Sequence, residues 1–265
     1  MPGPHHARDA KVPGGINIKA ELALELQGDA FPATRYSVIS AARSANPAER
    51  SQAIDTITTF YWKPVYKYVR LRWNVDLDNA RDFTQDFFLR LIEKDFLGSY
   101  DPVKGRLRAF LRTCVDRMFL NQSRDAHRLK RGGTLAQQAL DFDEAEQELS
   151  KGAQKVDSPE DYFEKEWVRT LFAQAVEQLR VECESAGKNL HFQVFAGYDL
   201  DDSDPKPSYA NLAARFNLSV TDVTNYLAFA RREFRRCVLE KLRVMTGSEE
   251  EFCREAQSLL GVQPK

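Results

Sequence analysis

The sequence DNARDFTQDFFLRLIE at residues 78–93 decides the fold, together with GRLRAFLRTCVDRMFLNQSRD at residues 105–125. In the first segment Ala80, Phe83, Phe87 and Leu91 recur at steps of three and four residues, the period of an amphipathic helix. The second segment has the same period, and its apolar side consists of Leu107, Phe110, Leu111, Cys114 and Met118. The sequence therefore predicts two consecutive helices, separated by a turn at residues 98–102, that each bury one face.

The polar side of the first predicted helix carries a row of side chains that we call the acidic stripe. Its members are Asp78, Asp82, Gln85, Asp86, Leu89 and Glu93. Four carboxylates, an amide and a leucine on one side of a helix indicate a docking surface for a protein partner. The alternative interpretation is an ordinary solvated helix surface.

The second predicted helix is strongly basic. From Lys104 to Arg131 there are nine Lys or Arg against two acids, a net charge of +7. Guanidinium groups, an aromatic ring and an amide fall near one helical row, which suits phosphates, base faces and base edges of DNA. We call this row, with the residues before it, the basic stripe, and its candidate DNA-binding residues are Tyr100, Lys104, Arg106, Phe110, Arg117, Asn121, Arg124 and Arg128.

Length and charge pattern indicate two domains joined by a linker. The net charge of −1 over 265 residues hides an acidic stretch, Asp141–Glu166, and two basic ones, a pattern typical of nucleic-acid binders with an acidic spacer. The four cysteines are scattered without metal-ligand spacing, and neither an export signal nor a membrane-length apolar run is present, so we expect a cytoplasmic protein without a metal. The expected order is a disordered tail at 1–28, a helical domain at 29–131, a flexible acidic linker at 132–158, a second helical domain at 159–243 and a C-terminal extension at 244–265.

Residues 208–243 carry a second motif. A short amphipathic segment ends at Asn217, a residue type that tolerates the left-handed conformation of a tight turn. Ser219 and Asp222 then form a capping box at the start of another helix, so the spacing predicts a helix-turn-helix. The outward positions that we expect to contact duplex DNA are Thr221, Thr224, Asn225, Ala228, Arg231, Arg232 and Arg235.

Together these segments resemble bacterial RNA polymerase sigma factors of the extracytoplasmic-function (ECF) group, the minimal kind with only regions two and four. The likeness covers about Phe31–Arg243. Residues 78–91 are similar to the segment that binds polymerase, residues 105–131 to the part that recognises and melts the downstream promoter element, and residues 209–236 to the helix-turn-helix that reads the upstream element. The order and spacing of all three make the resemblance specific.

The resemblance implies an all-α protein that directs promoter recognition and melting, without catalysis and without a cofactor. The implied partners are RNA polymerase core, through its β′ clamp helices and β flap, and promoter DNA, with an anti-sigma factor or a kinase as a possible regulator. Thr84 is the candidate phosphorylation site, beside Arg81, where the family often has an acid. The extension at 244–265 is expected to be a helix on the second domain or a regulatory tail.

Two other classes of protein share some of these sequence features. A stand-alone helix-turn-helix regulator of transcription needs only Ser208–Arg243 and leaves the acidic stripe unexplained. A nucleic-acid hydrolase that uses Asp82 and Asp86 with a metal fits least, because these carboxylates are expected on an exposed helix face with no His or Cys nearby in the sequence.

Overall fold

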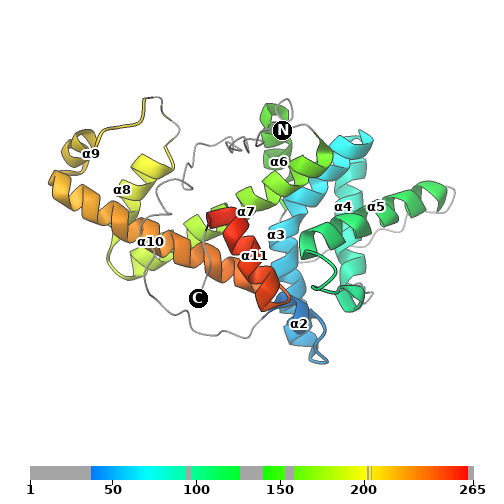
Figure 1. Cartoon of the computed structure of the whole chain (residues 1–265). Coiled ribbons are helices and arrows are strands. Elements are labelled where there is room, and N and C mark those ends of the chain that lie inside the picture. Colours follow the sequence, from blue (N-terminus) through cyan, green and yellow to red (C-terminus); the bar gives the residue numbers. More distant parts are fainter. Residues whose placement is uncertain are drawn as a thin grey trace, which may run out of the picture. The chain divides into compact units, whose positions relative to one another are not determined.

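The computed structural model describes residues 37–93, 97–125, 140–152, 158–201, 203 and 205–261. Within these ranges the regular structure is entirely helical (Figure 1). The described residues form two compact units. The first, which we call the N-terminal unit, holds described residues up to 175 and residues 238–258; the second, the helix-turn-helix unit, holds residues 176–237 and 259–261. None of the described helices is long and apolar enough to cross a membrane.

The N-terminal unit contains most of the helices. They are α2 (Val38–Ala42), α3 (Pro47–Trp73), α4 (Leu77–Glu93), the short 3-10 helix η2 (Leu97–Ser99), α5 (Leu107–Asp125), α6 (Phe142–Gly152), the first part of α7 (Pro159–Ser185), the last part of α10 (Val220–Val244) and most of α11 (Glu249–Leu260). Helix α3 packs against α2, α4 and α6, and α4 packs against α5 (Figure 1).

Helix α3 begins where its capping residues predict. Asn46 adopts an extended conformation, its side-chain oxygen accepts a hydrogen bond from the Ala48 amide at 3.0 Å, and Pro47 occupies the first helical position. A proline inside a helix removes one backbone hydrogen bond and commonly kinks or breaks the helix, but α3 continues undivided through Pro64, whose side chain is buried.

The two amphipathic helices predicted over residues 78–93 and 105–125 are confirmed as α4 and α5. Ala80, Phe83, Phe87 and Leu91 are at most 5% exposed. Leu107, Leu111, Cys114 and Met118 are likewise buried on α5, at most 8% exposed. Phe110 is only half-buried, because it lies at the edge of the apolar face, with its ring centroid 5.3 Å from that of Tyr100.

Helix α6 lies where a flexible acidic linker was predicted at residues 132–158. Its apolar side chains Phe142, Ala145 and Leu149 are at most 7% exposed, and the Phe142 ring packs edge-on against Trp62 and Tyr66 of α3. Glu144 and Glu148 of α6 form ion pairs with Lys63 and Lys67 of α3, so the negative charge of this segment contributes to the contact between the two helices. Residues 132–139 and 153–157 of the predicted linker lie outside the described residues.

The helix-turn-helix unit comprises the rest of α7, α8 (Asn189–Asp199), α9 (Tyr209–Phe216) and residues 220–237 of α10. Both predicted turn signals are confirmed: Asn217 has a φ of 54°, in the left-handed region, and the Ser219 hydroxyl oxygen accepts a hydrogen bond from the Asp222 amide at 3.0 Å. The Asp222 carboxylate in return accepts from the Ser219 amide at 3.1 Å, which completes the capping box.

The C-terminal extension differs from the expectation of a helix on the second domain. Residues 249–258 of α11 belong to the N-terminal unit, as do the last residues of α10. The physical reason is a set of buried acids on α11 that contact α5 and the turn before it. The predicted boundaries at 158/159 and 243/244 therefore do not coincide with the edges of the compact units.

Candidate nucleic-acid interface

The acidic stripe divides into an exposed and an engaged part. Asp78 and Asp82 are exposed, whereas Gln85, Leu89 and Asp86 are half-buried. Asp86 pairs with Arg90 at 3.1 Å and accepts a hydrogen bond from Gln122 Nε2 of α5 at 2.6 Å. The Glu93 side chain lies outside the described residues. Carboxylates available to a partner are therefore those of the first turns of α4.

Arg81 borders the acidic stripe, and α6 compensates its charge. Its guanidinium forms an ion pair with Asp143 and lies 5.6 Å from the centroid of the Phe142 ring. The neighbouring carboxylate Glu146 accepts hydrogen bonds from Arg70, and these, more than any other contact, hold the pKa of Glu146 below its usual range.

Thr84 does not suit a kinase. The side chain is 0% exposed, and its hydroxyl donates a hydrogen bond to the Ala80 carbonyl at 2.7 Å. A kinase would need this helix face to leave the core, because the buried hydroxyl is already satisfied within α4. Thr84 leans toward the apolar side of α4, as its place in the sequence indicates, and its hydroxyl is not accessible to a kinase in the folded unit.

The basic stripe is exposed along the outer side of α5. Lys104, Arg117 and Asn121 are exposed, and Arg117 and Asn121 are four residues apart, so they neighbour each other on one helix face. Leu120 lies beside them and is 52% exposed, a feature that sequence reasoning missed because its position looked like an ordinary apolar residue. The Arg124 side chain and Arg128 lie outside the described residues.

Tyr100 was predicted to bind DNA as part of the basic stripe, but it is buried. The residue is 4% exposed, and its hydroxyl oxygen lies 2.9 Å from both carboxylate oxygens of Glu251 and 3.1 Å from the Gly105 carbonyl oxygen. Burial, with the Glu251 charge, raises the pKa of Tyr100 well above its ordinary value. A ring held in this way cannot stack on a DNA base, because both its faces are covered by protein.

Arg106 is partly engaged by the C-terminal helix. Its Nε lies 2.8 Å from Glu255 Oε1, and 42% of the side chain remains exposed. The neighbouring Arg108 is 5% exposed; its guanidinium lies 4.5 Å from the centroid of the Trp167 ring and contacts Glu164 and Glu255. Arg106 can therefore still reach a phosphate, whereas Arg108 is part of the core.

The helix-turn-helix presents a polar surface at the start of α10. Thr221, Thr224 and Asn225 are exposed and Ala228 is half-buried. Arg232 is 62% exposed in its side chain, and its charge is suited to a phosphate.

Arg231 and Arg235 were predicted on the same outward face of α10, but neither side chain is fully exposed. Arg231 forms two hydrogen bonds of 3.0 Å with the Asp199 carboxylate of α8, and Arg235 is only 5% exposed. Arg235 follows the buried Phe234 and precedes the buried Val238 by three residues, so its stem lies at the buried side of α10. The outward placement of Arg235 is wrong, and Arg231 joins α10 to α8.

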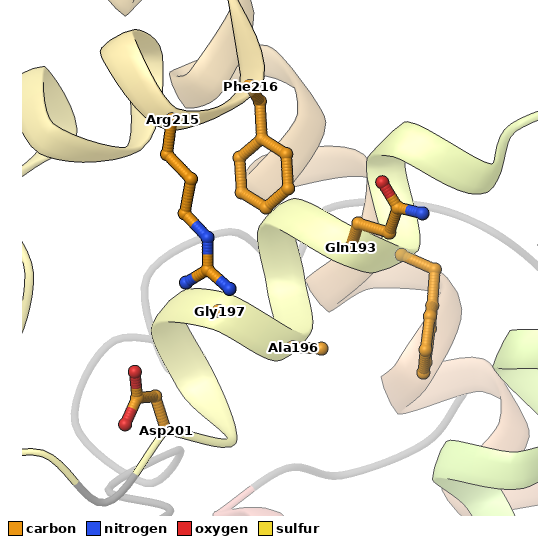
Figure 2. Close-up of a pocket in the computed structure, with 7 residues that line it drawn as sticks. Gln193, Ala196, Gly197, Asp201, Arg215 and Phe216 are labelled. Carbon is orange, nitrogen blue, oxygen red and sulfur yellow. The ribbon is translucent and has the colours of Figure 1, made fainter.

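A pocket of about 570 Å³ lies in the helix-turn-helix unit between α8 and α9 (Figure 2). Arg215 and Phe216 extend from α9 toward α8, where Gly197 leaves room for them; a Cβ there would lie 3.7 Å from both side chains. Sequence reasoning missed this pocket, although a glycine inside an apolar helix is a signal of close approach. The lining residues are Phe192, Gln193, Ala196, Gly197, Asp201, Arg215 and Phe216.

Candidate surfaces on α4, α5 and α10 follow one another along the chain in an order that a known protein family shares. Residues 72–240, more than half of the chain, match the family model of ECF sigma factors. The chain belongs to the ECF sigma factor family. As an ECF sigma factor it binds RNA polymerase and directs transcription initiation from promoters. The family is a class of non-enzymatic transcription factors. No curated protein and no solved structure matches the chain at a significant level.

Some helices of this sigma factor lie inside the region that matches the family model, and others lie outside it. It includes the acidic stripe on α4, the basic helix α5 and the helix-turn-helix. Helix α2, nearly all of α3 and the whole of α11 lie outside it. The C-terminal helix is thus an addition to the matched region, although its buried acids contact α5.

Proposed function

We propose that this sigma factor binds RNA polymerase core through Asp78 and Asp82 of the acidic stripe, at the β′ clamp helices. The observation that carries the proposal is the exposure of both carboxylates on a helix whose opposite face is core. An acidic surface of this kind complements a basic one and speeds association with it. Asp86 contributes less, because Arg90 and Gln122 already engage it.

The downstream promoter element binds α5 in this proposal. Lys104, Arg106 and Arg117 supply cations for phosphates, and Asn121 supplies an amide for a base edge. Unstacking a base costs a few kcal/mol per step, and each base–aromatic stack returns roughly 1–3 kcal/mol. Phe110, the half-buried ring of the stripe, is the side chain available for such a stack.

The helix-turn-helix reads the upstream element as duplex DNA. Thr221, Thr224 and Asn225 lie at the N-terminal end of α10, the part of a recognition helix that usually meets base edges. Arg232 lies farther along and suits the phosphate backbone. The pocket between α8 and α9, with Phe192 and Phe216 in its lining, suits an apolar segment of polymerase, and the β flap is the expected one.

Charge reversal tests the polymerase contact. Asp78→Lys combined with Asp82→Lys should weaken binding to core polymerase at least tenfold, because like charges would face each other across the contact. Glu250→Lys, a reversal at an exposed acid of α11, is the matched control and should bind as the unmodified protein does. Circular dichroism should show the same helical content in all three proteins. A doubly substituted protein that binds core polymerase normally at moderate salt contradicts the docking assignment.

A further inference from the structure

Glu251 of α11 caps the N-terminus of α5. The residue is 2% exposed, and its carboxylate accepts hydrogen bonds from the Leu107 amide at 3.0 Å and from the Gly247 amide at 2.7 Å. Leu107 is the first residue of α5, whose leading amides have no partner within the helix. A carboxylate at this end also interacts favourably with the helix dipole. The start of the basic helix is thus completed from a segment more than a hundred residues away.

Glu255, one turn along α11, holds two arginines of the same region. It is 2% exposed, and its carboxylate lies 2.6 Å from Arg108 Nη1 and 2.8 Å from Arg106 Nε. The two arginines differ in surroundings, because Arg108 is buried and Arg106 keeps 42% of its side chain exposed. Glu255 therefore holds the Arg106 guanidinium group close by its charge, without a hydrogen bond to Nε, while the Arg106 side chain remains accessible from solvent.

Two roles of α11 give opposite expectations: a removable cover over the DNA-binding surface, or a permanent part of it. The burial favours permanence. Phe252 and Ala256 are at most 1% exposed, so removing α11 would expose apolar surface to water, and it would also take away Glu255, one of the two carboxylates that pair with Arg108. The segment before α11 fits tightly as well, since a Cβ on Gly247 would lie 3.1 Å from Pro102 and 3.2 Å from Tyr100.

We propose that α11 is a permanent part of the downstream-element surface, in which Glu251 and Glu255 are positioning residues. Glu251 fixes the first turn of α5 and the Tyr100 ring beside Phe110. Glu255 orients Arg106 so that its guanidinium meets a DNA phosphate. The proposal rests on the proposed function of α5 as the binding site of the downstream element, and it assigns to the C-terminal extension a role in promoter binding.

The salt dependence of DNA binding tests this role. The full chain with core polymerase is titrated with a promoter fragment whose downstream element is single-stranded, over a series of salt concentrations. Arg106→Ala should reduce the slope of log affinity against log salt by about 0.7, as expected for one lost phosphate contact on single-stranded DNA. Glu255→Gln should weaken binding by a similar factor, about three- to tenfold, with the same change in slope, and should have no further effect on top of Arg106→Ala.

The controls separate positioning from folding. Glu250→Gln removes a charge from the exposed side of α11 and should leave both affinity and slope unchanged. Should Glu255→Gln fail to fold, Glu255→Asp keeps the negative charge while shortening the reach of the carboxylate by one methylene, and it should change the slope in the same direction.

Three results overturn the proposal. If Arg106→Ala lowers the slope and Glu255→Gln does not, the positioning role is wrong and the DNA contact stands. If Glu255→Gln tightens DNA binding, Glu255 competes with the phosphate for Arg106 and does not position it. If Arg106→Ala changes nothing, the phosphate role of Arg106 on which the proposal rests is itself wrong.

Discussion

Replacing Lys67 by Met should destabilise the N-terminal unit, in which this side chain of α3 pairs with α6 and α7. The ammonium group is 0% exposed and lies 2.5 Å from Glu148 Oε2 and 2.6 Å from Glu166 Oε1. Removing one partner from a buried ion pair costs about 3–5 kcal/mol, because the remaining charge is left buried and unpaired. Here the loss should be near the lower limit, about 3 kcal/mol. Glu166 keeps Arg169 at 2.9 Å, and Glu148 keeps Lys63 at 3.1 Å and is 41% exposed.

Chemical denaturation of the full chain measures this loss, because Glu166, the carboxylate that loses Lys67 in the core, lies on α7. A loss of about 3 kcal/mol corresponds to a fall of about 100-fold or more in the folding equilibrium constant. Lys63→Met is the matched control, since Lys63 pairs with the same helix but is 20% exposed, and it should cost less than about 1 kcal/mol.

The double variant Lys67→Met with Glu166→Gln should be more stable than Lys67→Met alone, because the uncompensated buried charge is removed. If Lys67→Met costs no more than Lys63→Met, the buried Lys67–Glu166 pair contributes no more than an exposed pair, and the reasoning from burial is refuted.

Three further predictions concern DNA and pH. Asn225→Ala should change discrimination within the upstream element by about 1–3 kcal/mol with little change in salt slope, whereas Arg232→Ala should weaken all sequences alike and lower the slope by about one; binding titrations on duplex variants distinguish the two. Arg117→Ala should keep closed-complex binding but lower the permanganate reactivity of downstream thymines, and a pre-melted template should restore transcription; without that rescue, only a general phosphate contact remains. Burial and the hydrogen bond to Glu146 raise the pKa of Tyr66 to about 12, so its contribution to stability is present below about pH 10 and is lost as the pH rises toward 12. Tyr66→Phe should make the fall in stability over this range less steep in chemical denaturation, and an unchanged pH profile would contradict the assignment.

Local signals in the sequence predicted the helices α4, α5 and α10, which carry the candidate surfaces. The apolar period predicted α4 and α5, and Asn217 with the Ser219–Asp222 pair predicted the turn and the start of α10. These features are local, because caps and one-sided burial depend on neighbours within a few residues. They needed no knowledge of distant contacts.

Long-range pairing of charges could not be predicted in the same way. The acids of α6 read as a solvated linker, although Phe142, Ala145 and Leu149 recur at helical spacing. Their partners are cations of α3 about eighty residues earlier, and no local pattern identifies them. The expectation that the C-terminal extension packs on the second domain differs from the structure for the same reason. Glu251 contacts Tyr100, 151 residues earlier, and Leu107, 144 residues earlier.

Run-off transcription with core RNA polymerase tests the central claim most directly, that this chain is the specificity subunit for a set of promoters. Core enzyme is incubated with a library of promoter fragments from the native genome, with and without the protein, and transcripts are mapped by their 5′ ends. The account predicts initiation at discrete sites that depends on the protein and is lost with Asp78→Lys combined with Asp82→Lys. Transcripts that are the same with and without the protein, under conditions where it binds core polymerase, would contradict the account.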